Sequence, residues 1–271
     1  MSAECVSAGL ASEQRGTGHP VVLLHGWALN LTVWRDCARA LEQRYRVISL
    51  DLPGHGRSTW GQELESFDRQ VELLDRSLPG ERVSLLGWSL GGLFAMALAA
   101  RRPERIAKLV LVATSPRFVT GPDWQFGLSL LTVRKFASQL KANYRQTVND
   151  FLELQTRGSV QAGPVLAELR SALDERGDAA PGALRAGLSI LEQSDLRAEA
   201  ASISAPVLLV SGQYDRITPP AAMKALQALL RDARRVEIGR AGHAPFLSHS
   251  ELFQREVGMF LDDRDQSGEH E

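Results

Sequence analysis

The sequence predicts an α/β fold with a mostly parallel central sheet, flanking helices and an inserted helical cap. Short apolar runs alternate with helical patterns along most of the 271 residues, which is typical of a parallel sheet covered on both faces. The alternation stops over 117–195, where the pattern is helical without a convincing strand, and it resumes at 206–211. We therefore expect a core formed by 1–116 and 196–271 and a cap formed by 117–195.

Each strand of the core is predicted from a short apolar run of the kind found in strands that are buried on both faces. These runs cover 21–24, 45–50, 83–86, 107–113, 206–211 and 235–238. Helical patterns cover 32–43, 67–78, 94–100, 220–230 and 250–261. Residues 1–19 are poorly patterned and fit either a frayed end or a weak edge hairpin. The charged segment after 261 predicts a disordered tail.

Composition argues against several classes of protein. A formal net charge of −1 gives no reason to expect a nucleic acid or a membrane as partner. No apolar run approaches the roughly 20 residues of a membrane span, and the first residues lack the pattern of a signal peptide. Cys5 and Cys37 form neither a disulfide framework nor a metal-binding pattern. We expect a cytoplasmic monomer.

The segment Gly87-Trp88-Ser89-Leu90-Gly91 follows an apolar run and precedes a helix of small residues. Gly-x-Ser-x-Gly alone is a weak signal, because glycine and serine also form ordinary turns between strands and helices. A strand, a tight turn and a helix in this order are the context of a nucleophile elbow. Ser89 is therefore the predicted nucleophile.

A serine nucleophile needs a histidine base and a carboxylate that orients the histidine. Asp215 follows the strand at 206–211, and His243 follows the strand at 235–238. Taken singly, Asp215 could cap the next helix and His243 could be a packed loop residue. Their positions at the ends of successive strands, in the chain order Ser, Asp, His, predict a catalytic triad.

An oxyanion hole needs two N–H donors near the nucleophile. The backbone of Leu90 is the first predicted donor. The backbone of Trp27, in the loop after the strand at 21–24, is the second. His25 is expected to support this loop, and His55 is expected to pack within its own Gly-His-Gly turn.

Together these segments resemble the α/β-hydrolase superfamily over about 20–262. A closer resemblance, to the pimeloyl-[acyl-carrier protein] methyl ester esterases of biotin synthesis, rests on four segments. They are His25-Gly26-Trp27-Ala28-Leu29-Asn30, Gly87-Trp88-Ser89-Leu90-Gly91-Gly92, Phe151-Leu152-x-Leu154-Gln155 and His243-Ala244-Pro245-Phe246-x-Ser248-His249.

The resemblance implies an α/β-hydrolase fold and a serine carboxylesterase that releases methanol from pimeloyl-acyl-carrier protein methyl ester without cofactor or metal. It implies an acyl channel between core and cap. The residues implied to contact substrate are Trp27, Ser89, Leu90, Phe151, Leu152, Glu153, Leu154, Gln155 and His243.

In this family, basic residues of the cap hold the acidic carrier protein. Here the candidates are Arg134, Lys135, Lys141, Arg145 and Arg157. A solvated helix face explains the same residues equally well, and Asp150 and Glu153 weaken the positive patch.

Other functions remain open on the same scaffold. A general short-chain carboxylesterase, a carbon–carbon bond hydrolase or a haloperoxidase-like esterase would share the predicted triad, and so would a non-catalytic small-molecule receptor. Dehalogenases and epoxide hydrolases are disfavoured, because they use an aspartate where this chain has Ser89.

Overall fold

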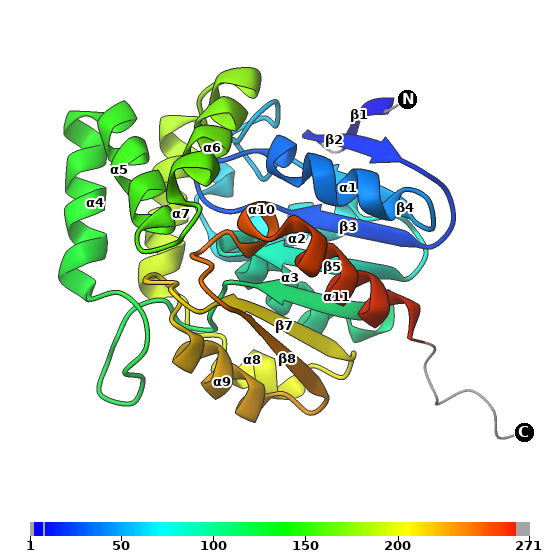
Figure 1. The fold of residues 1–271 in the computed structure, drawn as a ribbon. Helices are drawn as coiled ribbons and strands as arrows, with labels where there is room; N and C mark the ends of the chain where they lie inside the picture. The colour runs from blue at the N-terminus through cyan, green and yellow to red at the C-terminus, as the bar shows by residue number, and fades with distance from the viewer. Residues whose placement is uncertain (1–2, 8, 264–271) are drawn as a thin grey trace, which may run out of the picture.

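The computed structural model describes residues 3–7 and 9–263, which are built around one eight-stranded sheet (Figure 1). The order across the sheet is β1-β2-β4-β3-β5-β6-β7-β8. The strands are β1 (Ala3–Ser7), β2 (Leu10–Arg15), β3 (Pro20–Leu24), β4 (Arg46–Leu50), β5 (Val83–Trp88), β6 (Ile106–Val112), β7 (Val207–Gly212) and β8 (Ala233–Ile238). Strands β3 to β8 run parallel, so the predicted mostly parallel α/β-hydrolase sheet is confirmed.

Of the two alternatives predicted for residues 1–19, a frayed end or an edge hairpin, the structure shows the hairpin. Strand β1 pairs antiparallel with β2, and β2 pairs antiparallel with β4. The centre of the sheet is β3 beside β5, where Leu24 lies opposite Gly87. Because the strands are parallel, the loops that follow β3 and β5 leave from the same edge of the sheet. The disordered tail predicted after 261 falls largely on 264–271, outside the described residues.

Helices cover both faces of the sheet (Figure 1). Helix α1 packs against α11 on one face, and α3 packs against α2 and α8 on the other. The core helices are α1 (Arg35–Leu41), α2 (Phe67–Ser77), α3 (Leu90–Arg101), α8 (Arg197–Ser202), α9 (Pro220–Leu229), α10 (Pro245–Ser248) and α11 (Ser250–Asp262). Helices α8 and α10 were not predicted, because 6 and 4 residues are too few to show a helical period. The helix predicted over 32–43 is split, with a 3₁₀ turn at Leu31–Trp34 before α1.

Five helices lie between β6 and β7, and Figure 1 shows the first four gathered on one side of the molecule. These four are α4 (Leu130–Ala142), α5 (Tyr144–Thr156), α6 (Ala162–Arg176) and α7 (Pro181–Gln193). The segment 117–195, described throughout, contains isolated bridges at Val119–Leu128 and Gly121–Trp124 but no strand of the main sheet. Its assignment as a separate cap domain stays a prediction. No helix of the described residues is long and apolar enough to cross a membrane.

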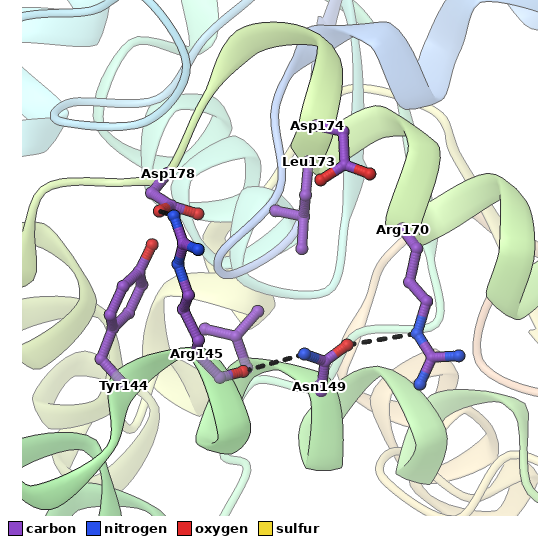
Figure 2. A pocket seen from close by; sticks show the side chains of 8 residues that line it. Tyr144, Arg145, Asn149, Arg170, Leu173, Asp174 and Asp178 are labelled. Atoms are coloured by element: carbon purple, nitrogen blue, oxygen red, sulfur yellow. Dashed lines mark hydrogen bonds and ion pairs between the residues drawn. The ribbon is translucent and has the colours of Figure 1, made fainter.

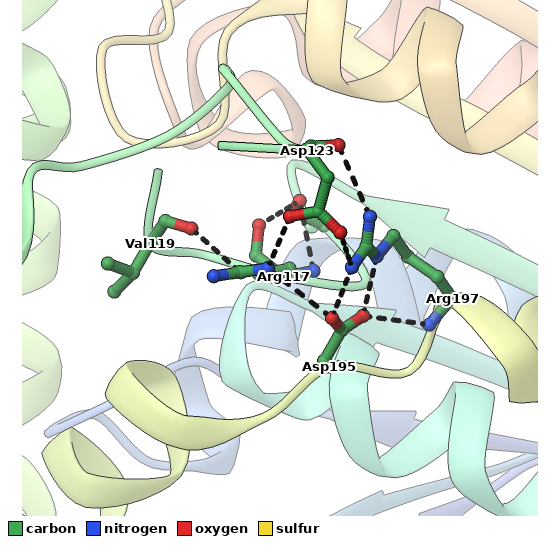
Figure 3. A network of polar contacts seen from close by, with 6 residues as sticks. Arg117, Val119, Asp123, Asp195 and Arg197 are labelled. Atoms are coloured by element: carbon green, nitrogen blue, oxygen red, sulfur yellow. Dashed lines mark hydrogen bonds and ion pairs between the residues drawn. The ribbon is translucent and has the colours of Figure 1, made fainter. Parts of the chain in front are cut away.

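A network of ion pairs holds together the two ends of the segment 117–195 (Figure 3). Arg197 Nη2 lies 2.7 Å from Asp123 Oδ2 and 2.6 Å from Asp195 Oδ2. Arg117 Nη1 lies 3.1 Å from Asp123 Oδ1. The hydrogen bonds from Arg197 hold the pKa of both carboxyl groups below the usual range. These ion pairs therefore join the start of the segment 117–195 to its end.

Candidate active site

Ser89 occupies a tight turn between β5 and α3. Its backbone has φ 54° and ψ −116°, a conformation that side-chain-bearing residues rarely adopt. The neighbouring backbone is crowded, because a Cβ added to Gly87 would lie 2.5 Å from the carbonyl oxygen of Gly91. A Cβ on Gly91 would collide with the carbonyl of Leu24. These glycines allow strand and helix to close around Ser89, as the predicted elbow requires.

The three predicted triad residues lie in one hydrogen-bonded chain. Ser89 Oγ is 2.9 Å from His243 Nε2, and His243 Nδ1 is 2.8 Å from Asp215 Oδ2. All three side chains are buried. Because a carboxylate only accepts, Nδ1 carries the proton and Nε2 is free to accept the hydrogen of the Ser89 hydroxyl. This arrangement can transfer a proton from the serine to the histidine.

Asp215 is held by more than the histidine. Its Oδ1 accepts the N–H groups of Ile217 at 2.8 Å and Thr218 at 3.0 Å. Its Oδ2 accepts the Thr218 hydroxyl at 2.7 Å in addition to His243. Helix α9 begins later and is preceded by Pro219, so Asp215 does not cap it. The carboxylate is therefore fixed in the orientation that presents Oδ2 to the imidazole.

The backbone of His243 is also held from two sides. The indole Nε1 of Trp88 donates to the His243 carbonyl at 2.8 Å. The His243 N–H donates to the carbonyl of Gln155, near the end of α5, at 3.0 Å. The sequence analysis missed Trp88, because a tryptophan beside the nucleophile carries no pattern that reveals its distant partner.

His25 supports the loop that carries Trp27. The N–H of Leu52 donates to His25 Nε2 at 2.9 Å, so the ring proton is on Nδ1, which donates to the Gly26 carbonyl at 2.8 Å. A Cβ added to Gly26 would lie 3.3 Å from the Cβ of Ser89. The Trp27 loop therefore lies directly beside the nucleophile. Leu90 opens α3 on the other side, where helical N–H groups have no acceptor within the helix.

Three contacts from α6 and α7 hold the same loop region. Trp27 Nε1 donates to the Leu184 carbonyl at 2.9 Å, and Asn30 Nδ2 donates to the Ala172 carbonyl at 2.6 Å. Buried Arg176 lies 3.1 Å from Asp51, whose other carboxylate oxygen accepts the N–H of Leu31. The position of this loop thus depends on how α6 and α7 pack against it.

The implied acyl-contact stretch of α5 is split between two faces of the helix. Phe151, Leu152 and Gln155 are buried, and the Phe151 ring meets the Trp27 ring edge-on at 4.9 Å. In the described part of the chain, the buried Oε1 of Gln155 has no hydrogen-bond partner. Leu154 is half-buried against the core. Glu153 is exposed and pairs with Arg170 at 3.0 Å, so it does not join the others.

Two of the five basic residues expected to contact a carrier are engaged in ion pairs within the segment 117–195. Arg134 lies 3.0 Å from Glu192, and Arg145 lies 3.1 Å from Asp178. Figure 2 shows the latter pair at a pocket of about 300 Å³ between α5 and α6, which none of the predicted triad residues lines. Lys135, Lys141 and Arg157 are exposed. Over the described residues, no cluster of His, Cys, Asp and Glu is arranged to hold a metal ion.

His25 and His55 predict a loss of stability in acid. Their rings are 5.4 Å apart, and burial lowers the pKa of His25 to about 4 and that of His55 to about 3. Below pH 6.5 the two histidines bind protons in the unfolded chain but not in the folded chain. Their contribution to the free energy of unfolding is therefore fully present above pH 6.5 and is lost as the pH falls toward 4. His25 alone accounts for a loss on the order of 3 kcal/mol.

Urea unfolding at a series of pH values measures this loss. The variant His55→Asn removes one titrating ring, so its free energy of unfolding should depend less steeply on pH between 6.5 and 4. Equal slopes for the two proteins would show that His55 does not take part.

Comparison with known proteins places the chain among hydrolases. The family profile described as alpha/beta hydrolase fold matches residues 19–250. A pimeloyl-[acyl-carrier protein] methyl ester esterase from Nitrosomonas europaea is 45% identical over 246 residues, covering 91% of this chain and 97% of that protein. A protein of the same name from Nitrosospira multiformis is 38% identical, and the alignment covers 92% of this chain and 96% of that protein. Another, from Aeromonas hydrophila, is 40% identical, and the alignment covers 92% of this chain and 98% of that protein.

Solved structures give the same fold. A bromoperoxidase from Bacillus anthracis superposes with a TM-score of 0.85 at 24% identity, covering 97% of this chain and 100% of that one. An esterase from Exiguobacterium antarcticum gives 0.86 at 21% identity, covering 94% and 96%. At these identities the likeness extends to the fold alone.

Proposed function

This chain belongs to the α/β-hydrolase-fold family and groups with its pimeloyl-[acyl-carrier protein] methyl ester esterases, and we propose that it catalyses that reaction. It is a serine carboxylesterase that cleaves the methyl ester of pimeloyl-acyl-carrier protein in biotin synthesis and releases methanol. The observation that carries the proposal is the 45% identity to a protein of that name along 91% of the chain. The buried chain of hydrogen bonds from Ser89 to Asp215 supports it.

The proposed mechanism follows from the hydrogen bonds of the site. His243 Nε2 takes the proton of Ser89 as Oγ attacks the ester carbonyl, and Asp215 stabilises the imidazolium that forms. The N–H groups of Leu90 and Trp27 bind the oxyanion, and each is worth about 3 kcal/mol of barrier. His243 then protonates the departing methoxide and activates the water that cleaves the acyl-enzyme.

The pimeloyl chain lies against the apolar side chains that join core and cap. Trp27 and Phe151 pack edge to face, and Leu152 is buried in the same helix. A Cβ added to Gly187 would lie 3.4 Å from the side chain of Leu90, so α7 packs closely against the residue that follows Ser89. The buried amide oxygen of Gln155 has no hydrogen-bond partner among the described residues, and a polar group of the bound substrate would supply one. The reaction needs no cofactor or metal, and we propose a cytoplasmic monomer as the working form.

Competing substrates test this function. The wild-type enzyme should cleave pimeloyl-carrier-protein methyl ester with a kcat/KM at least about tenfold above that for free methyl pimelate or p-nitrophenyl acetate, because the carrier adds binding energy. The preference should shrink at high salt, since exposed charges are screened. Equal or better activity on the free esters would make the protein a general carboxylesterase. Turnover of no ester would favour a receptor.

A further inference from the structure

We propose that the acyl-carrier protein docks on a small surface beside the loops that carry Asp215 and His243, an inference that rests on the proposed function. This surface, the rim patch, consists of Arg157, Val160, Tyr214, Arg216 and Arg240. All five residues are exposed. They come from the α5–α6 connection, the loop after β7 and the turn after β8.

Backbone and packing contacts bring these three segments together. The N–H of Val160 donates to the Arg240 carbonyl at 3.3 Å. A Cβ added to Gly158, the neighbour of Arg157, would lie 3.8 Å from both Arg216 Nε and the Cβ of Tyr214. The Tyr214 N–H donates to the Ala241 carbonyl at 2.8 Å. Residues distant in sequence thus form one continuous surface.

The rim patch adjoins the catalytic chain of hydrogen bonds. Arg216 directly follows Asp215, and Arg240 precedes His243 by three residues. Arg157 lies two residues beyond Gln155, whose carbonyl accepts the His243 N–H. A carrier bound here would hold its acyl group beside the nucleophile.

The positive charge of the rim patch is not neutralised by the protein. Arg157, Arg216 and Arg240 have no ion pair among the described residues. The nearby acidic side chains are already engaged: Glu153 with Arg170 at 3.0 Å and Glu237 with Arg235 at 3.1 Å. The carboxylate of Asp215 is buried below the surface. An acidic carrier protein would supply the missing charge.

Arg240 holds a backbone conformation that its side chain makes costly. Its φ of 62° lies in the left-handed region, where glycine or asparagine is less strained. The turn is fixed by the Gln213 side chain, which accepts the Arg240 N–H at 2.9 Å, and by the bond to Val160. An arginine kept in such a position points to use of its side chain.

The apolar members of the rim patch also fit a protein partner. Tyr214 and Val160 are 42% and 49% exposed, and they are two of five large hydrophobic side chains exposed in the described part of the chain. Tyrosine and arginine are the residue types that contribute most at protein interfaces. On α4 and α5, by contrast, Arg134 and Arg145 already pair with acidic groups of the cap.

Three charge-matched variants of the full-length enzyme test the proposal. The rim variant is R157Q/R216Q/R240Q, the rival cap variant is R134Q/K135Q/K141Q, and the control is R69Q/R101Q/R255Q on α2, α3 and α11. The readout is the ratio of kcat/KM for pimeloyl-carrier-protein methyl ester to that for free methyl pimelate. Because the free ester uses the same triad, the ratio separates docking from damage to Asp215.

The rim variant should lower this ratio at least about tenfold and make it less dependent on salt. The control variant should keep the wild-type ratio and the wild-type salt dependence. The lysine version, R157K/R216K/R240K, should recover most of the ratio because it keeps the charge. An unchanged ratio in the rim variant would overturn the rim patch, whether or not the cap variant lowers it, and would leave the proposed function intact. If the wild-type enzyme does not prefer the carrier-bound ester, the proposed function fails and the rim patch fails with it.

Discussion

Replacing Ser89 with alanine should lower kcat for methyl ester hydrolysis by roughly 10⁴- to 10⁶-fold. The reason is the loss of the attacking atom, since Ser89 Oγ lies 2.9 Å from His243 Nε2 and can give up its proton there. The residual rate should come from the oxyanion donors and substrate binding alone. Single-turnover assays with the carrier-bound ester would measure the loss without interference from a slow second step.

Stability measurements separate this effect from misfolding. Ser89→Ala keeps the Cβ at φ 54°, so its melting temperature should stay close to that of the wild type. Ser89→Gly removes the Cβ as well and should melt at a higher temperature while remaining inactive, because glycine adopts positive φ without strain. Activity within tenfold of wild type in either variant would exclude Ser89 as the nucleophile.

Changing Asp215 to asparagine should lower kcat by about 10⁴-fold through the wrong histidine tautomer. The hydrogen-bond donors around residue 215 determine the orientation of the asparagine amide. Its oxygen must occupy the Oδ1 position, where the N–H groups of Ile217 and Thr218 donate. The NH₂ group then faces His243 Nδ1 and donates to it, which places the ring proton on Nε2. A protonated Nε2 cannot accept the hydrogen of Ser89.

Thr218→Val is the matched control for Asp215→Asn. It removes the hydroxyl that donates to Asp215 Oδ2 at 2.7 Å but keeps the carboxylate and the shape of the side chain. The loss of one hydrogen bond should cost only about tenfold in kcat. Nuclear magnetic resonance of the His243 ring should show the proton on Nδ1 in the wild type and on Nε2 in Asp215→Asn. Equal activity losses in the two variants would contradict the tautomer argument.

The sequence by itself determined the local elements and their order. Buried parallel strands are marked by short apolar runs, and glycines at 87 and 91 mark a turn that other residues cannot make, so β3, β5, β7 and the elbow were predicted. Ser89, Asp215 and His243 were found because each follows such a strand. Short helices such as α8 and α10 were missed because 6 and 4 residues are too few to show a helical period. The substrate was suggested by resemblance, which the comparisons support.

Only the tertiary structure decided what holds these residues in place. The Trp88 indole reaches the carbonyl of His243 across 155 positions of sequence, and the N–H of His243 reaches back to Gln155. Asn30 and Arg176 join the loop beside Ser89 to α6 in the same way. Local patterns depend on the preferences of adjacent residues, whereas these bonds depend on how separate helices and loops pack. That packing is why exposed arginines from three segments meet in the rim patch.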